Sequence, residues 1–144
     1  MEAPVVNKPQ WRHYAVLLAM LEETLREIER IAEGAVPPGR LSALEADLPR
    51  ETADLLLREC ADVRERVYRL ADLLAVPSHS TSAMRRVSAA LITSVVHLED
   101  STSDRLAGYG PVDPSVERIV DPAIRDLHDR LSSLASRVNP AGRE

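Results

Sequence analysis

The amino-acid sequence predicts an all-α protein and, within that class, an antiparallel up-and-down four-helix bundle. Four long segments carry apolar residues at alternating steps of three and four, the spacing of one side of a helix. Prolines, glycines and serines break the chain between these segments. No stretch of useful length alternates apolar with polar residues as a strand does. With no Phe and only 3% aromatic residues, the core must be aliphatic, which suits helix-on-helix packing.

Length and composition indicate one domain that has neither nucleic acid nor a membrane as a partner. The 144 residues match one ordinary domain, which we place over residues 11–139, and the formal net charge of -5 disfavours nucleic acid. The single cysteine excludes an internal disulfide. No apolar run approaches the length of a membrane span or a signal peptide, so the expected location is the cytoplasm.

The first helix is expected to follow a flexible arm. Residues 1–10 carry two prolines and little pattern, which is typical of such an arm. The helix is then predicted from Trp11 to Glu33, because Gly34 and the run Pro37-Pro38-Gly39 end it. Its apolar seam consists of Tyr14, Leu18, Leu21, Leu25, Ile28 and Ala32.

The longest connection, Arg40–Arg50, contains a signal for a short extra helix. Ser42 and Glu45 have the spacing of a capping box, in which each side chain bonds the backbone N–H of the other residue. We therefore expect a short helix in this first connection, ended or interrupted by Pro49.

The second helix, expected from Arg50 to Leu74, carries the most regular seam and is predicted to lie at the centre of the bundle. Steps of three and four alternate along this seam without a break. On its outer face, acidic residues precede arginines by four positions, which is typical of a solvated surface. The seam consists of Ala53, Leu56, Cys60, Val63, Val67, Leu70 and Leu74.

The third helix, expected from Ser82 to Ala107, carries a second apolar stripe in addition to its core stripe. Ala89, Ile92 and Val96 form this second stripe, which points away from the first on a helical wheel. An exposed Ile and Val favour a subunit contact, so we predict an interface at these three residues. Two alternatives stay open: the third helix is the most enclosed one, or the first connection covers the stripe.

The last helix is expected to be broken near its start. Asp113-Pro114 and Asp121-Pro122 each signal the beginning of a helix. A short helical turn over Pro114–Val120 is therefore predicted to lead, through a kink, into a main helix over Pro122–Val138. One helix bent at its internal proline is the alternative. A polar tail is expected over residues 140–144.

No catalytic or metal-binding arrangement stands out in most of the sequence. Gly-rich phosphate loops, Gly-x-Ser-x-Gly elbows and His-Glu-x-x-His motifs are absent, and the four histidines lie in different segments. We therefore expect a non-enzymatic module without a cofactor, which works through protein–protein interaction as a homo-oligomer or in a larger complex. A bundle with a small-molecule cavity is a further possibility, for which the sequence offers no polar anchor.

One short motif indicates a different class of function. Glu59-Cys60-Ala61-Asp62-Val63 resembles the Glu-x-x-Asp-Val half-motif of the MazG-type all-α nucleotide pyrophosphohydrolases. In that family, carboxylates on two helices hold Mg²⁺ on the phosphates of the substrate. The resemblance implies Glu59 and Asp62 as metal ligands together with Glu23 and Glu27 of the first helix. The partner motif of the family reads Glu-x-x-Glu, whereas Glu23 and Glu27 are four positions apart. A Mg²⁺-dependent nucleotide pyrophosphohydrolase is therefore the alternative function.

Overall fold

The structure, a computed structural model, describes residues 3–138 and is all-helical over that range, which confirms the predicted fold class. No strand occurs among these residues, and none of their helices is long and apolar enough to cross a membrane. The long helices are α1 (Lys8–Ala32), α2 (Arg50–Leu73), α3 (Ala83–Glu99) and α5 (Asp121–Val138), and the short ones are α4 (Ser103–Leu106), the 3₁₀ turn η1 (Ala107–Tyr109) and the π-helical turn η2 (Val116–Val120).

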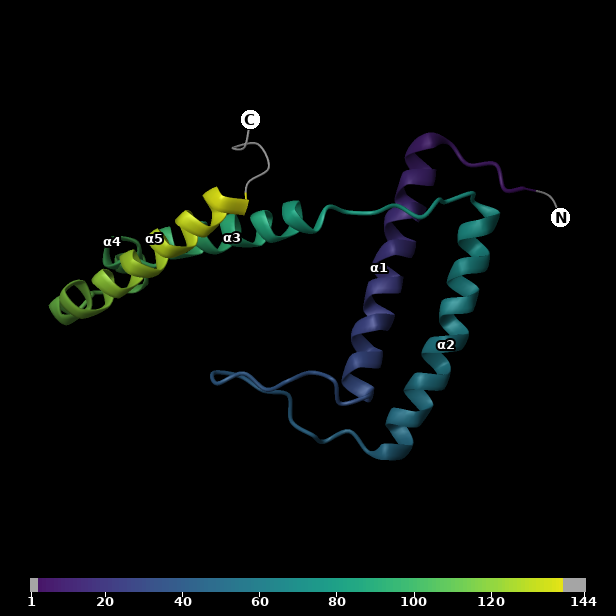
Figure 1. The fold of residues 1–144 in the computed structure, drawn as a ribbon, viewed down its shortest axis with the longest axis horizontal. Helices are drawn as coiled ribbons and strands as arrows, with labels where there is room; N and C mark the ends of the chain where they lie inside the picture. The colour runs from purple at the N-terminus through teal and green to yellow at the C-terminus, as the bar shows by residue number, and fades with distance from the viewer. Residues whose placement is uncertain (1–2, 139–144) are drawn as a thin grey trace. The chain divides into compact units, whose positions relative to one another are not determined.

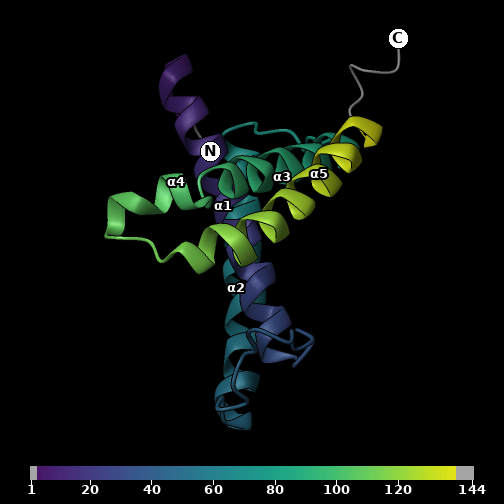
Figure 2. The same ribbon diagram turned by 90° about the vertical axis from the view of Figure 1, so that its left-hand side faces the viewer.

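The long helices pair as two antiparallel hairpins. The chain divides into two units, Met1–Ser78 and His79–Glu144. Helix α1 packs along α2 in the first unit, and α3 packs along α5 in the second (Figures 1 and 2). The predicted four-helix bundle is thus not confirmed, and the joining of both hairpins into one domain over residues 11–139 stays a prediction.

Helix α1 begins one turn earlier than the sequence analysis placed it. The side chain of Asn7 accepts a hydrogen bond from the backbone N–H of Gln10, and the Gln10 side chain accepts one from the Asn7 N–H, each at 2.9 Å. This reciprocal capping box starts the helix at Lys8, inside the segment expected to be a flexible arm. At the other end, Gly34 adopts a positive φ of 68°, which a glycine tolerates without a steric penalty.

The core of the first hairpin is a narrow row along each helix. Its members recur every seven residues, which is two helical turns, so each helix contributes one line of side chains. The indole N–H of Trp11 closes the end of this core by donating to the carbonyl oxygen of Leu74 at 2.7 Å. The buried apolar side chains are Leu18, Leu25, Cys60, Val67 and Leu74.

The connection between α1 and α2 contains no helix, so the short helix expected there is wrong. The carbonyl oxygen of Ser42 accepts a hydrogen bond from the N–H of Gly39 at 2.9 Å, which places Ser42 in a turn. The six residues 43–48 are too few to form a stable isolated helix before Pro49. Pro49 instead stands immediately before α2, where its fixed φ is compatible with a helix start.

Helix α3 ends at Glu99, eight residues before the predicted end at Ala107. The chain turns after α3 and begins a new short helix, α4, at Ser103. The carboxylate of Asp121, only 2% exposed, accepts hydrogen bonds from the hydroxyl and the backbone N–H of Ser103. These bonds hold the first turn of α4 against the start of α5.

The last helical segment is continuous, as in the one-helix alternative. It begins at Pro114, passes through the π-helical turn η2 and continues directly into α5. Pro122 lacks the N–H that an α-helix needs for its bond to the carbonyl of Arg118. The N–H of Asp121 bonds the carbonyl of Val116, five residues back, so the chain accommodates the proline with a wider turn rather than a break.

Candidate functional site

The four carboxylates implied by the hydrolase resemblance are exposed on the first hairpin. Glu23 forms ion pairs with Arg26 and Arg30, each at 3.9 Å. Asp62 accepts a hydrogen bond from the guanidinium of Arg66 at 3.0 Å. Because arginines on their own helices neutralise these two carboxylates, their negative charge is already balanced locally.

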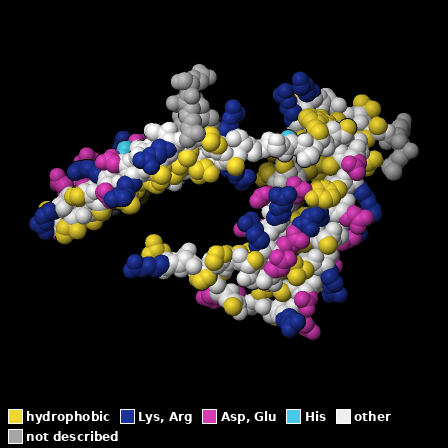
Figure 3. Space-filling model, viewed as in Figure 1, with side chains coloured by type: hydrophobic (Ala, Val, Ile, Leu, Met, Phe, Trp, Pro, Cys, Tyr) yellow, Lys and Arg dark blue, Asp and Glu magenta, His cyan; other side chains and the backbone are white. Residues whose placement is uncertain are grey.

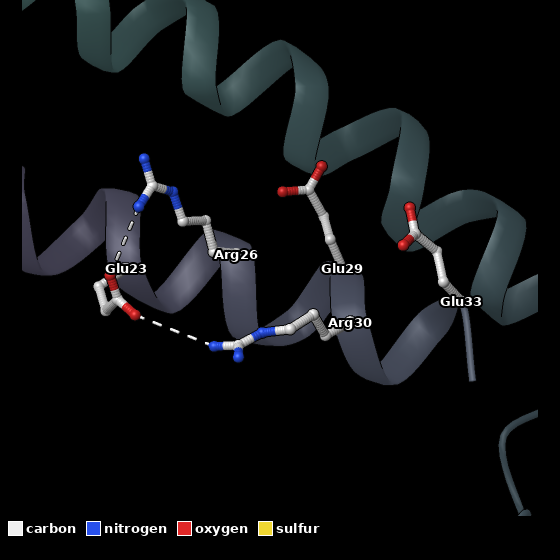
Figure 4. A pocket seen from close by; sticks show the side chains of 5 residues that line it. All are labelled: Glu23, Arg26, Glu29, Arg30 and Glu33. Carbon is white, nitrogen blue, oxygen red and sulfur yellow. Dashed lines mark ion pairs between the residues drawn. The ribbon is translucent and has the colours of Figure 1, made fainter. Parts of the chain in front are cut away.

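A shallow hollow of about 430 Å³ on the surface of α1 lies beside Glu23 (Figure 4). Glu29, which also lines the hollow, is held by Arg64 of α2 in a two-point ion pair with one distance of 3.0 Å. Glu27, Glu59 and Asp62 do not line this hollow, and no group of three or more metal-binding side chains forms among residues 3–138. The structure therefore does not assemble the four implied ligands, and the hydrolase alternative stays a prediction.

One side of the first hairpin is held by polar contacts between α1 and α2. Besides the Glu29–Arg64 pair, the hydroxyl of Tyr68 donates to the carboxylate of Glu22 at 2.6 Å. This hydrogen bond and the negative charge of Glu22 raise the pKa of Tyr68, because both disfavour the phenolate. Three of the four residues lie four positions after a buried residue, so these contacts line one edge of the core.

The opposite side of this hairpin is apolar and open. Leu21, Val63 and Leu70 each follow a buried residue by three positions, which places them on the other edge of the core row. Each of the three side chains is between 38% and 41% exposed. We call this surface the α1–α2 apolar face; its exposed members are Tyr14, Leu17, Leu21, Val63 and Leu70.

No apolar side chain of the second hairpin is fully buried among the residues described, although Leu91, Val95 and Leu131 are half-buried. Its two buried residues are Ser88 and Asp121, whereas Leu127 and Leu134 of α5 are 48% and 45% exposed. Hydrophobic side chains accordingly gather along the α3–α5 hairpin (Figure 3). We call this surface the α3–α5 apolar face; its exposed members are Met84, Val87, Leu127 and Leu134.

The stripe predicted as an interface is exposed on a different side of α3. Ile92 is 51% exposed, Val96 is 48% exposed and Ala89 is exposed as well. The stripe borders a shallow groove of about 380 Å³, which is also lined by small residues of α5, including Ser132 and Ser136. The three residues thus lie together and uncovered, and their role as a subunit contact stays a prediction.

His128 links α5 to α3 at the edge of this groove. Its Nε2 lies 3.0 Å from a carboxylate oxygen of Glu99, and its Nδ1 lies 3.3 Å from Asp129. Hydrogen bonding to Glu99, and then to Asp129, raises the pKa of His128. When it is protonated, the imidazole forms a charge-assisted hydrogen bond with Glu99 of α3, and this bond favours the pairing of the two helices.

No protein-family model, curated protein or solved structure matches this chain. The assignment of a function therefore rests on the surfaces just described.

Two of the contacts that organise the second hairpin do not follow from the sequence pattern. Asp121-Pro122 predicts the start of a helix, and α5 does begin at Asp121, but the Asp121 side chain also bonds Ser103 of the neighbouring helix α4. His128 follows the half-buried Ile124 by four positions, and this helical spacing indicates that both side chains face the partner helix. Its pairing with Glu99, 29 residues away, depends on how the two helices align.

Proposed function

We propose that this chain is a non-enzymatic helical module that acts through protein–protein contact, as a homo-oligomer or as part of a larger complex. The observation that carries the proposal is the open apolar face on each hairpin. An amphipathic helix gains most of its stability by burying its apolar side against another element. Faces that stay about 40–50% exposed therefore favour further helices as partners.

We also propose that the two hairpins are the halves of the predicted four-helix bundle. The α1–α2 apolar face and the α3–α5 apolar face are the surfaces that such a bundle buries. Both halves come from one chain in a monomeric bundle, or from two chains in an exchanged dimer. A cytoplasmic location, with neither nucleic acid nor membrane as a partner, remains part of the proposal.

The proposal is tested by measuring the mass in solution with multi-angle light scattering over a range of concentrations. We expect a multiple of the 15.9 kDa chain mass, and we expect Ile92→Glu to lower it, because a charge in the stripe opposes burial. Ala90→Glu introduces the same charge on the far side of α3 and should leave the mass unchanged. A monomeric mass that neither variant alters would overturn self-association.

The hydrolase alternative makes the opposite prediction in an activity assay. Under the interaction proposal, incubation with a panel of nucleoside triphosphates and Mg²⁺ should release no pyrophosphate. Turnover that disappears in Glu59→Gln would replace the interaction proposal with the hydrolase.

A further inference from the structure

We infer that a second copy of this chain docks on α3 in antiparallel orientation, about a two-fold axis at Ile92, so that Arg85 of each copy meets Glu99 of the other. The inference rests on the proposed self-association and adds the partner, its orientation and the charges that select it. It uses the stripe on α3 and leaves both apolar faces available for the bundle.

The two charges extend the apolar stripe in line with it. The order Arg85, Ala89, Ile92, Val96, Glu99 has steps of four, three, four and three, so all five residues share one side of α3. Arg85 lies seven residues before Ile92 and Glu99 lies seven residues after it. Each charge is therefore about 10 Å from the centre of the stripe along the helix axis.

This symmetric spacing makes the helix complementary to itself in one orientation. When two copies of α3 pair antiparallel about Ile92, each Arg85 lies level with the Glu99 of the other copy, and two attractive contacts form. A parallel pairing in register places arginine beside arginine and glutamate beside glutamate. Like charges in contact are unfavourable, so the charge pattern selects the antiparallel dimer.

The charged ends of the row are accessible for these contacts. Within residues 3–138, no ion pair joins Arg85 to a carboxylate. The Glu99 side chain is 57% exposed, and only its Oε1 is bonded to His128. The second carboxylate oxygen of Glu99 and the adjacent acidic residue Asp100 are left to receive the arginine of the other copy.

The side chains within the row also fit an antiparallel pair. Ala89 lies three residues before Ile92 and Val96 lies four after it, so a small residue of one copy faces a branched one of the other. Small residues of α5, including Ser132 and Ser136, line the groove beside the stripe and leave about 380 Å³ for the approaching helix. Close approach of the two α3 helices is therefore compatible with the shape of this surface.

Charge reversal on the full chain tests the orientation. We expect Arg85→Glu and Glu99→Arg each to weaken the dimer, with a roughly tenfold rise in its dissociation constant by sedimentation equilibrium, because both contacts become repulsive. The double variant and an equimolar mixture of the two single variants should both recover the wild-type value. Only pairing of position 85 with position 99 of the other copy predicts both recoveries.

Two controls separate this effect from other consequences of the substitutions. Arg12→Glu, on α1, changes the net charge by the same amount as Arg85→Glu. It should leave the dissociation constant of the dimer unchanged. Glu99→Gln removes the negative charge and weakens the His128 contact without introducing repulsion, so it should have a smaller effect than Glu99→Arg. Circular dichroism verifies that each variant keeps its helical content.

A cross-linking experiment provides an independent measurement. In Ile92→Cys, oxidation should produce a disulfide-linked dimer, because the new thiol lies on the two-fold axis. Ala90→Cys, on the far side of α3, should not cross-link, and the native Cys60 is buried in both variants. Absence of cross-linking at position 92 would overturn the dimer geometry.

The outcomes distinguish this inference from the proposed function. One outcome is that Ile92→Glu lowers the mass, but the charge variants have the wild-type dissociation constant or the mixture does not recover it. In that case the antiparallel geometry is wrong and self-association stands. If the wild-type chain is monomeric at every concentration, both self-association and this inference fail.

Discussion

The side chain of His128 makes the stability of the second hairpin depend on pH. Its imidazole lies between Glu99 of α3 and Asp129 of its own helix, and both carboxylates favour the protonated form. Because its pKa is raised in the folded state, the folded chain binds this proton more tightly than the unfolded chain does. The resulting stability is fully present below the ordinary pKa of 6.5 and is lost as the pH rises through the higher folded pKa.

We therefore expect His128→Gln to remove a pH-dependent part of the stability. The melting temperature of the wild type, measured by circular dichroism, should exceed that of the variant at about pH 6, and the difference should shrink by about pH 8.5. His97 on α3 is exposed, and within residues 3–138 its side chain forms no hydrogen bond or ion pair, so His97→Gln is the matched control. Equal differences at both pH values would contradict this role of His128.

At the scale of the elements, Asp121 joins the start of α5 to the first residue of α4. Its buried carboxylate accepts the hydroxyl and the backbone N–H of Ser103, and these bonds lower the pKa of Asp121. A lowered folded pKa contributes stability above the ordinary value of 3.8, and this contribution is lost as the pH falls through the folded pKa. The same contact holds α4 against the start of α5.

Asp121→Ala should lower the melting temperature at neutral pH, because it leaves a partly buried N–H and hydroxyl of Ser103 without their acceptor. The difference from wild type should shrink as the pH falls through the lowered folded pKa of Asp121, because the native carboxylate is then protonated. Asp126→Ala, which removes only an exposed pair with Arg130, should have little effect in the same melting experiment. An Asp126→Ala effect as large as that of Asp121→Ala would argue against a stabilising role of the Asp121–Ser103 hydrogen bonds.

At the scale of the whole molecule, the apolar faces decide how the hairpins assemble. In the first hairpin, Val67 is buried at 7% exposure, whereas Val63, on the same helix, is 38% exposed. If the first hairpin stays uncovered, a smaller side chain at Val63 should have little effect on its stability. If the hairpin forms half of a bundle, the same substitution should lower its stability.

The pair Val67→Ala and Val63→Ala tests the bundle in solution. Val67→Ala should cost about 2 kcal/mol of unfolding free energy, because it removes buried methyl groups and leaves a cavity. If the bundle forms, Val63→Ala should cost nearly as much in chemical denaturation. A cost below about 0.5 kcal/mol, typical of a surface substitution, would show that this face is uncovered.

Much of the local structure followed from residue spacing. Steps of three and four along α2 predicted its helix and its buried line at Cys60 and Val67, because a helix brings such positions to one side. Proline and glycine positions predicted most helix ends for the same local reason. The helix expected at Ser42 was wrong because a six-residue segment before Pro49 lacks the length to stabilise itself.

Contacts between distant segments were decided by the tertiary structure. The placement of α4 depends on the Asp121 carboxylate, which lies 18 residues beyond Ser103. The motif resemblance implies Glu23 and Asp62 as metal ligands. In the folded chain, each of these carboxylates instead forms ion pairs with arginines of its own helix. Spacing along a helix predicts which side chains share a face, because helix geometry is local. Which helix face packs against which other helix depends on contacts between distant segments, and these contacts exist only in the folded chain.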